Sequence, residues 1–265
     1  ANVGALSAIM DGSYAAVADR LCHASLMDGI RLSGARKVYF HHNDLGHLED
    51  LLKKATEKKR MIVTESLFSM DGDFAPMADL VVLAKKHSAL LYVDDAHALG
   101  IYGNAGCGLS QWADFRVGTF GKALGLEGAA VATDSLTKKY LVHTARTFVF
   151  STAPVPALAH AALEAIRIVQ GMDAERQQIH AVAEQIRNGA EALGYPTGKS
   201  QSHIIPLLCE SEATALSAAE KLVGAGYHVK AIRPPTVKQS RLRISVNAGI
   251  DKMVAAGFLK GLAGC

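Results

Sequence analysis

The sequence has few cysteines, no long hydrophobic run and no block of charge. Its four cysteines stand far apart in 265 residues and form no C-x-x-C pair, which excludes a disulfide framework and predicts reduced thiols in a cytoplasmic protein. No apolar run approaches the roughly 20 residues that span a bilayer, so no membrane association is expected. The net charge of +3 includes no basic block longer than Lys58, Lys59 and Arg60, so nucleic-acid binding has no support.

What is present is the composition of an ordinary globular protein. Hydrophobic residues make up 49% of the chain and charged residues 20%, enough to bury one large domain or a large and a small one. The chain opens with Ala1–Leu6 inside an apolar helical pattern, with no initiator methionine and no capping residue before it. We therefore expect that material upstream of Ala1 is missing.

Short β-rich runs alternate with amphipathic helical patterns from residue 14 to residue 134. This alternation predicts right-handed βαβ crossovers and an α/β fold with a mostly parallel sheet covered by helices, in which ligands bind at the carboxyl ends of the strands. The expected strands and the clearest helices between them are Tyr14–Ala18, Lys37–His41, Arg60–Glu65, Ala89–Asp95, Arg116–Thr119 and Gly128–Thr133, with helices Leu45–Glu57 and Met77–His87.

After Ser151 the pattern changes to two long helices, expected over 155–170 and 174–193, and then to a smaller α+β unit. This change predicts a large domain over residues 1–170, and a linking helix with a small C-terminal α+β domain over residues 171–265. The elements expected in the small domain are strands 202–209, 227–232 and 241–246, a helix over 213–225 and a final helix.

Two stretches carry the clearest chemical signals. The strand that includes Tyr92 ends in Asp94, Asp95 and His97, where a carboxylate can contact a ligand over the sheet edge. A helix cap or a loop turn explains the same residues equally well. Farther along, Lys122 follows a glycine just after a short strand; glycine lets the backbone approach a ligand, and a pocket lysine can form a Schiff base. An isolated Gly-Lys pair would instead indicate a solvated lysine.

Two further stretches are weaker when taken alone. A buried strand runs into a turn rich in hydroxyls and carboxylates over residues 64–73, and the role of Glu65 within it stays open. His23 opens a helical pattern, a place where histidine more often packs or caps than takes part in catalysis. None of these stretches defines a function by itself.

The order and spacing of the four stretches resemble the α-oxoamine synthases, a family of fold-type I enzymes that depend on pyridoxal 5'-phosphate (PLP). Asp94-x-x-His97 followed by Thr119-x-x-Lys122 is the arrangement of fold-type I PLP enzymes, and the resemblance extends over essentially the whole chain. It implies that Lys122 holds PLP as a Schiff base and removes the α-proton of the amino acid, and that Asp94 pairs with the pyridine nitrogen. It also implies that His97 hydrogen-bonds the phenolic oxygen and that His23 stacks on the ring.

Four further residues match family positions. The resemblance implies that Ser69 and Thr119 contact the cofactor, and that Thr152 reaches the phosphate of the cofactor in the neighbouring subunit of a homodimer with shared active sites. Arg243 matches the arginine that binds the substrate carboxylate, a task suited to a planar guanidinium. Arg241 is the weaker candidate for that role because we expect it on the opposite face of the strand.

Segments Ala231–Val237 and Arg241–Ile244 are most similar to the branch of the family that serves biotin biosynthesis. The implied reaction is a decarboxylative condensation of L-alanine with a pimeloyl thioester carried by CoA or an acyl carrier protein. Glycine C-acetyltransferase or another α-oxoamine synthase is the alternative, and a non-catalytic scaffold subunit is disfavoured because Lys122 is present. Cys107 replaces a common arginine and Ala98-Leu99 a common Gly-Thr, which leaves the acyl group open.

Overall fold

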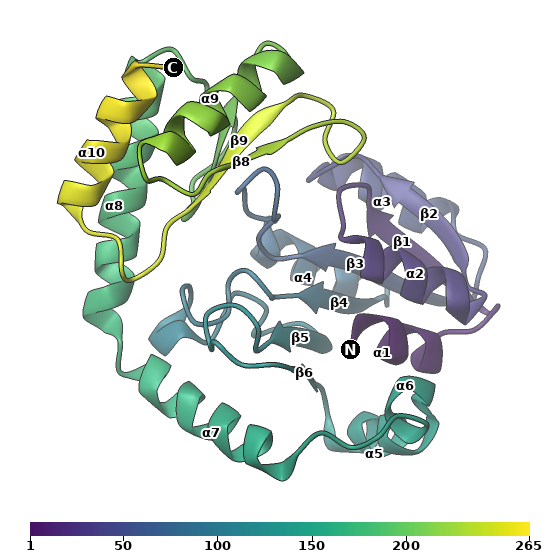
Figure 1. The fold of residues 1–265 in the computed structure, drawn as a ribbon. Helices are drawn as coiled ribbons and strands as arrows, with labels where there is room; N and C mark the ends of the chain where they lie inside the picture. Colours follow the sequence, from purple (N-terminus) through teal and green to yellow (C-terminus); the bar gives the residue numbers. More distant parts are fainter. The chain divides into compact units, whose positions relative to one another are not determined.

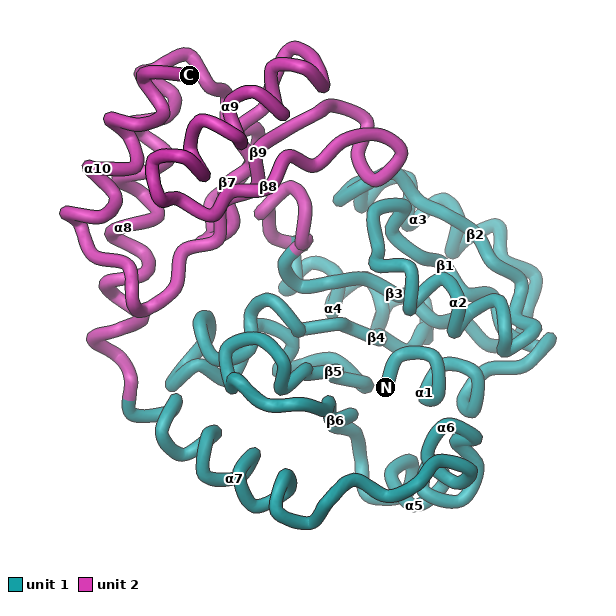
Figure 2. Tube along the Cα trace, viewed as in Figure 1, with its two compact units in different colours: residues 1–67, 75–171 teal, residues 68–74, 172–265 magenta.

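The computed structural model describes all 265 residues, and the chain divides into two compact units (Figure 2). Unit 1 contains residues 1–67 and 75–171, and unit 2 contains residues 68–74 and 172–265. The chain therefore passes between the units three times. Hydrophobic periodicity gives no signal for the short excursion at residues 68–74, because membership of a unit depends on contacts with residues far along the chain.

Unit 1 is built on a six-stranded sheet with the order β2-β1-β3-β4-β5-β6 (Figure 1). The first five strands pair in parallel and β6 pairs antiparallel with β5, so the predicted mostly parallel α/β sheet is confirmed. The central strands are buried along most of their length, which explains their continuous apolar runs. The strands are β1 Tyr14–Asp19, β2 Arg36–Phe40, β3 Lys59–Glu65, β4 Leu90–Asp94, β5 Phe115–Thr119 and β6 Ala129–Ala132.

Three helices of unit 1 begin at residues whose side chains accept hydrogen bonds from free backbone amides. The imidazole of His23 caps α2, and the carboxylates of Asp44 and Asp134 cap α3 and α5. Leu6 of α1 and Leu26 and Ile30 of α2 are fully buried in the core against the sheet. The helices are α1 Asn2–Ile9, α2 Ala24–Ser33, α3 Leu45–Lys54, α4 Met77–Lys86, α5 Ser135–Thr144, α6 Arg146–Val149 and α7 Pro156–Gln170, with a 3₁₀ turn at Asn104–Gly106.

Two features of unit 1 differ from the sequence prediction. Helix α3 ends at Lys54 rather than at residue 57, and Arg60 Nη2 donates a hydrogen bond to the carbonyl of Ala55 just beyond its end (3.0 Å). Helices α5 and α6 were not predicted. Because α5 buries only Leu141 and α6 buries nothing, neither carries the apolar stripe that periodicity detects.

Unit 2 holds a three-stranded antiparallel sheet with the order β7-β9-β8 and three helices. The strand expected from residue 227 forms only over the last three positions. The amide of Tyr227 instead donates to the carbonyl of Leu222 and closes the end of the preceding helix (2.9 Å). The elements are α8 Asp173–Ala192, β7 Ile204–Leu208, α9 Glu212–Gly224, β8 Lys230–Ile232, β9 Arg241–Ser245 and α10 Lys252–Ala263.

The segment of residues 68–74 is tied into unit 2 by close backbone contact. Gly72 has a φ of +67°, and a Cβ at this position would lie 1.9 Å from the carbonyl oxygen of Ile204. Only glycine fits here, because a side chain would be strained and would also clash with backbone. Arg241 Nη1 donates to the carboxylate of Asp71 (2.7 Å) and to the carbonyl of Met70 (3.0 Å).

Candidate active site

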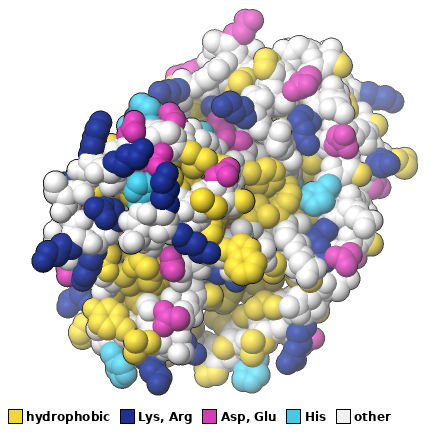
Figure 3. All heavy atoms as spheres, turned by 180° about the vertical axis from the view of Figure 1, so that it is seen from behind, with side chains coloured by type: hydrophobic (Ala, Val, Ile, Leu, Met, Phe, Trp, Pro, Cys, Tyr) yellow, Lys and Arg dark blue, Asp and Glu magenta, His cyan; other side chains and the backbone are white.

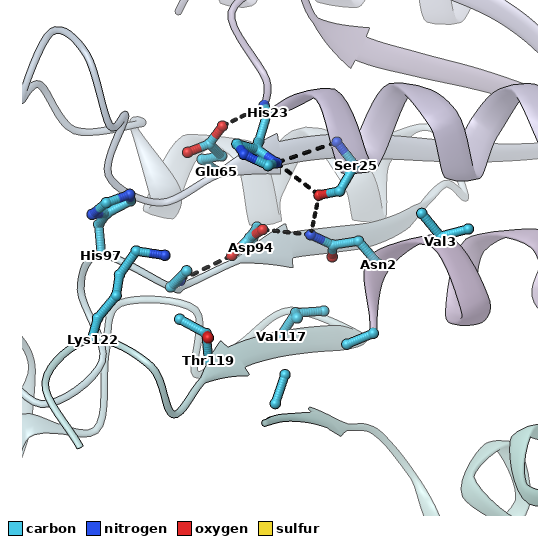
Figure 4. Close-up of a pocket in the computed structure, with 13 residues that line it drawn as sticks. Asn2, Val3, His23, Ser25, Glu65, Asp94, His97, Val117, Thr119 and Lys122 are labelled. Carbon is cyan, nitrogen blue, oxygen red and sulfur yellow. Dashed lines mark hydrogen bonds between the residues drawn. The ribbon is translucent and has the colours of Figure 1, made fainter. Parts of the chain in front are cut away.

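A pocket of about 230 Å³ opens in unit 1 at the carboxyl ends of the parallel strands (Figure 4). Parallel strands bring the residues that follow them to one edge of the sheet, which is why distant parts of the sequence meet there. The pocket contains five of the residues predicted from the sequence: His23, Asp94, His97, Thr119 and Lys122.

Lys122 lies in the loop between β5 and β6, and its amine points into the pocket between His97 and Asp94 in the view of Figure 4. The loop is held by backbone hydrogen bonds from Phe120 to Gly128 (2.8 Å) and from Leu126 to Phe120 (2.9 Å). The lysine is solvent-exposed, so a small molecule can reach the amine.

Asp94 is the last residue of β4 and is buried at the pocket. Its Oδ1 accepts a hydrogen bond from the amide of Ala96 (2.9 Å), and its Oδ2 accepts one from Asn2 Nδ2 (2.6 Å). The first bond forms the loop turn that the sequence analysis gave as an alternative to a ligand contact. The second bond fixes the carboxylate at the pocket. Asp94 therefore makes the turn that the structural interpretation predicted and also lines the pocket, and its role toward a cofactor stays a prediction.

His23 caps a helix, as the structural interpretation predicted, and it also lines the pocket. Its Nδ1 caps α2 by accepting from the amide of Ser25 (3.2 Å), and the hydroxyl of Ser25 lies 2.8 Å from the same nitrogen. Its backbone amide donates to Glu65 Oε1 (2.6 Å). A capping histidine is thereby held at the pocket wall.

Glu65 is a buried carboxyl beside a second one. It ends β3 directly opposite Asp94 of β4 in the sheet register, and only 4% of its surface is exposed. Burial, and then the negative charge of Asp94, raises the pKa of Glu65 to about 8, while the hydrogen bond from the His23 amide offsets part of this effect. The side chain is therefore a neutral carboxylic acid at pH 7.

Three predicted site residues do not line this pocket. Ser69 and Arg243 belong to unit 2, where Arg243 Nε donates to the carbonyl of Ser69 (2.6 Å). Thr152 is exposed in the segment between α6 and α7. The expectation that Arg241 faces away from Arg243 is wrong: residues two apart on a strand share a face, and both arginines bond to the segment of residues 68–74.

Besides Glu65, whose role the sequence left open, two polar residues of the pocket were not assigned a role from the sequence. Asn2 is buried at the start of α1 and Ser25 is half-buried in the first turn of α2. The sequence offered one signal for Asn2: it is a polar residue at a core position of the apolar pattern Ala1–Leu6. Their bonding partners lie far along the chain, and periodicity cannot reveal such partners.

A mostly parallel sheet with a loop lysine, an aspartate and two histidines at its carboxyl edge defines the class of fold-type I PLP-dependent transferases. The chain belongs to the aminotransferase class I and II family, whose model matches residues 1–262. Its relatives in sequence and structure lie in the α-oxoamine synthase branch, as the sequence indicated.

A curated relative from Bacillus cereus (strain B4264), provisionally named 8-amino-7-oxononanoate synthase, is 43% identical over 258 residues. The match covers 94% of this chain, and the chain spans only 65% of the length of that relative.

Two solved structures show how closely the fold agrees. A serine palmitoyltransferase from S. paucimobilis with bound PLP and myriocin has a TM-score of 0.94 at 27% identity, covering 99% of this chain and 69% of that one. An 8-amino-7-oxononanoate synthase from Francisella tularensis has a TM-score of 0.86 at 26% identity, covering 99% and 78%. No helix of this chain has both the length and the apolar character needed to cross a membrane.

Proposed function

We propose that this protein catalyses the decarboxylative condensation of L-alanine with a pimeloyl thioester, giving 8-amino-7-oxononanoate, carbon dioxide and a free thiol in biotin biosynthesis. The observation that carries the proposal is the placement of the Lys122 amine, the Asp94 carboxylate and the His23 imidazole in one pocket. The names of the relatives at 43% identity support the choice of substrates. The four free cysteines fit a reducing compartment, the cytoplasm.

The residues of the pocket fit PLP by their chemistry. A primary amine bonds the cofactor aldehyde, and a buried carboxylate fixed by two donors suits a protonated ring nitrogen. The imidazole of His23 offers a flat face to the ring, His97 a donor for its phenolic oxygen and Thr119 a hydroxyl for its phosphate. PLP, when bound, supplies an electron sink for the charge that develops at the α-carbon of the amino acid.

Two residues, Lys122 and Arg243, would then act on the substrate. Lys122 would take the α-proton of the amino acid on Nζ and later return it. Arg243 binds the substrate carboxylate; its Nε and Nη1 are engaged by Ser69 and Ser245, which leaves Nη2 for a ligand. Ser69 is proposed as a further cofactor contact from the same segment of residues 68–74. Arg241 is committed to Asp71 and is not assigned to the substrate.

The amino-acid substrate is tested by comparing L-alanine, glycine and L-serine at equal concentration with pimeloyl-CoA, in protein supplied with PLP. L-serine is included in the comparison because serine palmitoyltransferases are among the matching solved structures. We expect L-alanine to be preferred over glycine by about tenfold or more, the discrimination that one methyl group provides in an apolar pocket. Thiol release and product mass are measured. A preference for glycine with acetyl-CoA would move the assignment to glycine C-acetyltransferase.

We further propose a homodimer with shared active sites. Helices α5 to α7 and their connections expose many large apolar side chains, more than a monomer usually shows in one region. In the view from behind, hydrophobic side chains gather at the lower left, in the region of α5 and α6 (Figure 3). The apolar surface of α5 to α7 comprises Leu136, Tyr140, Val142, Phe148, Val149, Phe150, Val155, Leu163, Ile166 and Ile168. Thr152 lies in this stretch, as its proposed contact with the cofactor of a partner requires.

A glutamate in place of Phe148, a side chain 64% exposed in α6, will shift the protein toward monomer. Burying a charge at the centre of an apolar interface costs several kcal/mol, which raises the dimer dissociation constant about a hundredfold or more. Light scattering after gel filtration, over a range of protein concentrations, measures the shift. Val82→Glu is the matched control, because Val82 is 65% exposed on α4 away from this surface. Equal masses for both variants would remove the surface from the proposed interface.

A further inference from the structure

The carboxylate of Asp94 has one side-chain donor within the protein, and that donor is Asn2. Asn2 Nδ2 lies 2.6 Å from Asp94 Oδ2, and both residues are buried. A hydrogen bond to an ionised acceptor is stronger than a neutral one and more sensitive to position. The orientation of Asp94 at the pocket therefore depends on the orientation of Asn2.

Asn2 is itself fixed from behind. Tyr92, which is fully buried on β4 and stacks on Phe115 with ring centroids 5.8 Å apart, donates its hydroxyl to Asn2 Oδ1 (3.0 Å). Burial, and then the charge of Asp94, raises the pKa of Tyr92 well above its usual value, so the hydroxyl stays a donor. Because a carboxylate only accepts, the amide group of Asn2 has one orientation that serves both neighbours.

The second hydrogen of Asn2 Nδ2 connects Asn2 to His23 through the hydroxyl of Ser25 (Figure 4). It is donated to Ser25 Oγ (3.0 Å), and the hydroxyl of Ser25 lies 2.8 Å from His23 Nδ1. The amide of Ser25 also donates to this nitrogen (3.2 Å), so Nδ1 is an acceptor. The imidazole of His23 must then carry its proton on Nε2.

We propose that Asn2 is a positioning residue that fixes the carboxylate of Asp94 and the tautomer and plane of His23 together. One amide side chain joins the group that would pair with the ring nitrogen of PLP to the group that would lie against its ring. This inference rests on the proposed PLP-dependent function, since it concerns how the same pocket is prepared for the cofactor. An apolar side chain at position 2 removes both bonds, whereas loss of the Ser25 hydroxyl removes only the branch to His23.

The test compares Asn2→Leu, Ser25→Ala, Tyr92→Phe and the control Asn188→Ala, an exposed position on α8. We expect Asn2→Leu to weaken PLP binding, followed by fluorescence quenching, about 10- to 100-fold, because a charged hydrogen bond at the cofactor is lost. Tyr92→Phe should weaken it less, and Asn188→Ala should bind PLP as the wild type does. Asn2→Ser, a shorter hydrogen-bond donor, should restore part of the affinity.

A second measurement reports on His23 without any cofactor. Nitrogen-15 spectra of the PLP-free protein should show His23 protonated at Nε2, and Ser25→Ala and Asn2→Leu should both shift the tautomer ratio. A purely structural role for Asn2 would not move this signal, and Ser25→Ala, at a half-buried position, keeps the test open if Asn2→Leu fails to fold. If Asn2→Leu bound PLP with wild-type affinity, and the His23 tautomer were unchanged in Asn2→Leu and Ser25→Ala, the inference about Asn2 would be overturned and the proposed function would stand. A wild-type protein that binds no PLP would overturn the proposed function. The tautomer measurement would then still test whether Asn2 fixes the imidazole of His23.

Discussion

The Lys122→Ala protein will lose the absorption band that lysine-bound PLP gives, and its turnover will fall by about 10⁴-fold or more. One substitution removes two functions, because the same amine is proposed to bond the cofactor and to move the α-proton. The loop around Lys122 is held by backbone bonds of Phe120, Leu126 and Gly128, so the change should leave the fold intact. Thermal unfolding of the variant checks that point.

Borohydride reduction followed by peptide mass analysis is the decisive measurement for Lys122. In the wild-type protein the peptide that contains Lys122 should gain the mass of reduced PLP, and in the variant no peptide should gain it. Lys85→Ala, an exposed lysine of α4, is the matched control and should be labelled like the wild type. Labelling at another lysine in the wild type would show that Lys122 has been assigned the wrong role.

Replacing Glu65 with glutamine will stabilise the PLP-free protein at alkaline pH and leave its stability almost unchanged near pH 4. The pKa of Glu65 is raised from 4.5 to about 8 by burial and by Asp94. Between these two values the unfolded chain has released the proton while the folded protein holds it, so the free energy of unfolding falls as the pH rises. Above about pH 8 the loss is complete and constant.

The size of the Glu65 effect follows from the shift. At about 1.4 kcal/mol for each pH unit, a shift from 4.5 to about 8 gives an upper limit of about 5 kcal/mol for the advantage of the glutamine variant above pH 8. Glutamine keeps an oxygen that accepts from the His23 amide, so the local bond survives. Urea unfolding at pH 5 and at pH 9 measures the difference.

Glu184→Gln, at an exposed position of α8, is the control for Glu65 and should change the free energy of unfolding by less than about 0.5 kcal/mol at both pH values. An advantage of Glu65→Gln that is the same at pH 5 and pH 9 would mean that Glu65 is ionised over the whole range, and its assignment as a neutral acid would be abandoned.

The sequence predicted the parts of the structure that depend on neighbours along the chain. The strands of the parallel sheet, the helices that pack on it and the strand-end position of Asp94 all follow from local hydrophobic patterns. The resemblance to the α-oxoamine synthases implied that Lys122 and Asp94 serve one cofactor, and the pocket contains both residues. The chemical roles of these residues stay predictions.

What the sequence could not reveal depends on residues far apart in the chain. Asn2 and Asp94 are separated by 92 positions, and the bond between them exists only because α1 packs beside β4 in the folded protein. The neutral state of Glu65 depends first on its burial in the folded protein and then on strand register, which sets its carboxyl beside that of Asp94. Helix α5 was not predicted for a different reason: its surface is mostly exposed, so its sequence carries no hydrophobic periodicity.

The bonds that tie residues 68–74 into unit 2 can form only after a much later part of the chain has been synthesised. Arg241 contacts Met70 and Asp71 across 171 and 170 positions, so at roughly 5 to 20 residues per second it leaves the ribosome roughly 9 to 34 seconds after them. Every strand of the unit 1 sheet ends by Ala132, so all the residues of that sheet are synthesised well within that interval. We therefore expect the residues of the lysine pocket to have left the ribosome while residues 68–74 still lack Arg241 and Arg243 as hydrogen-bond partners.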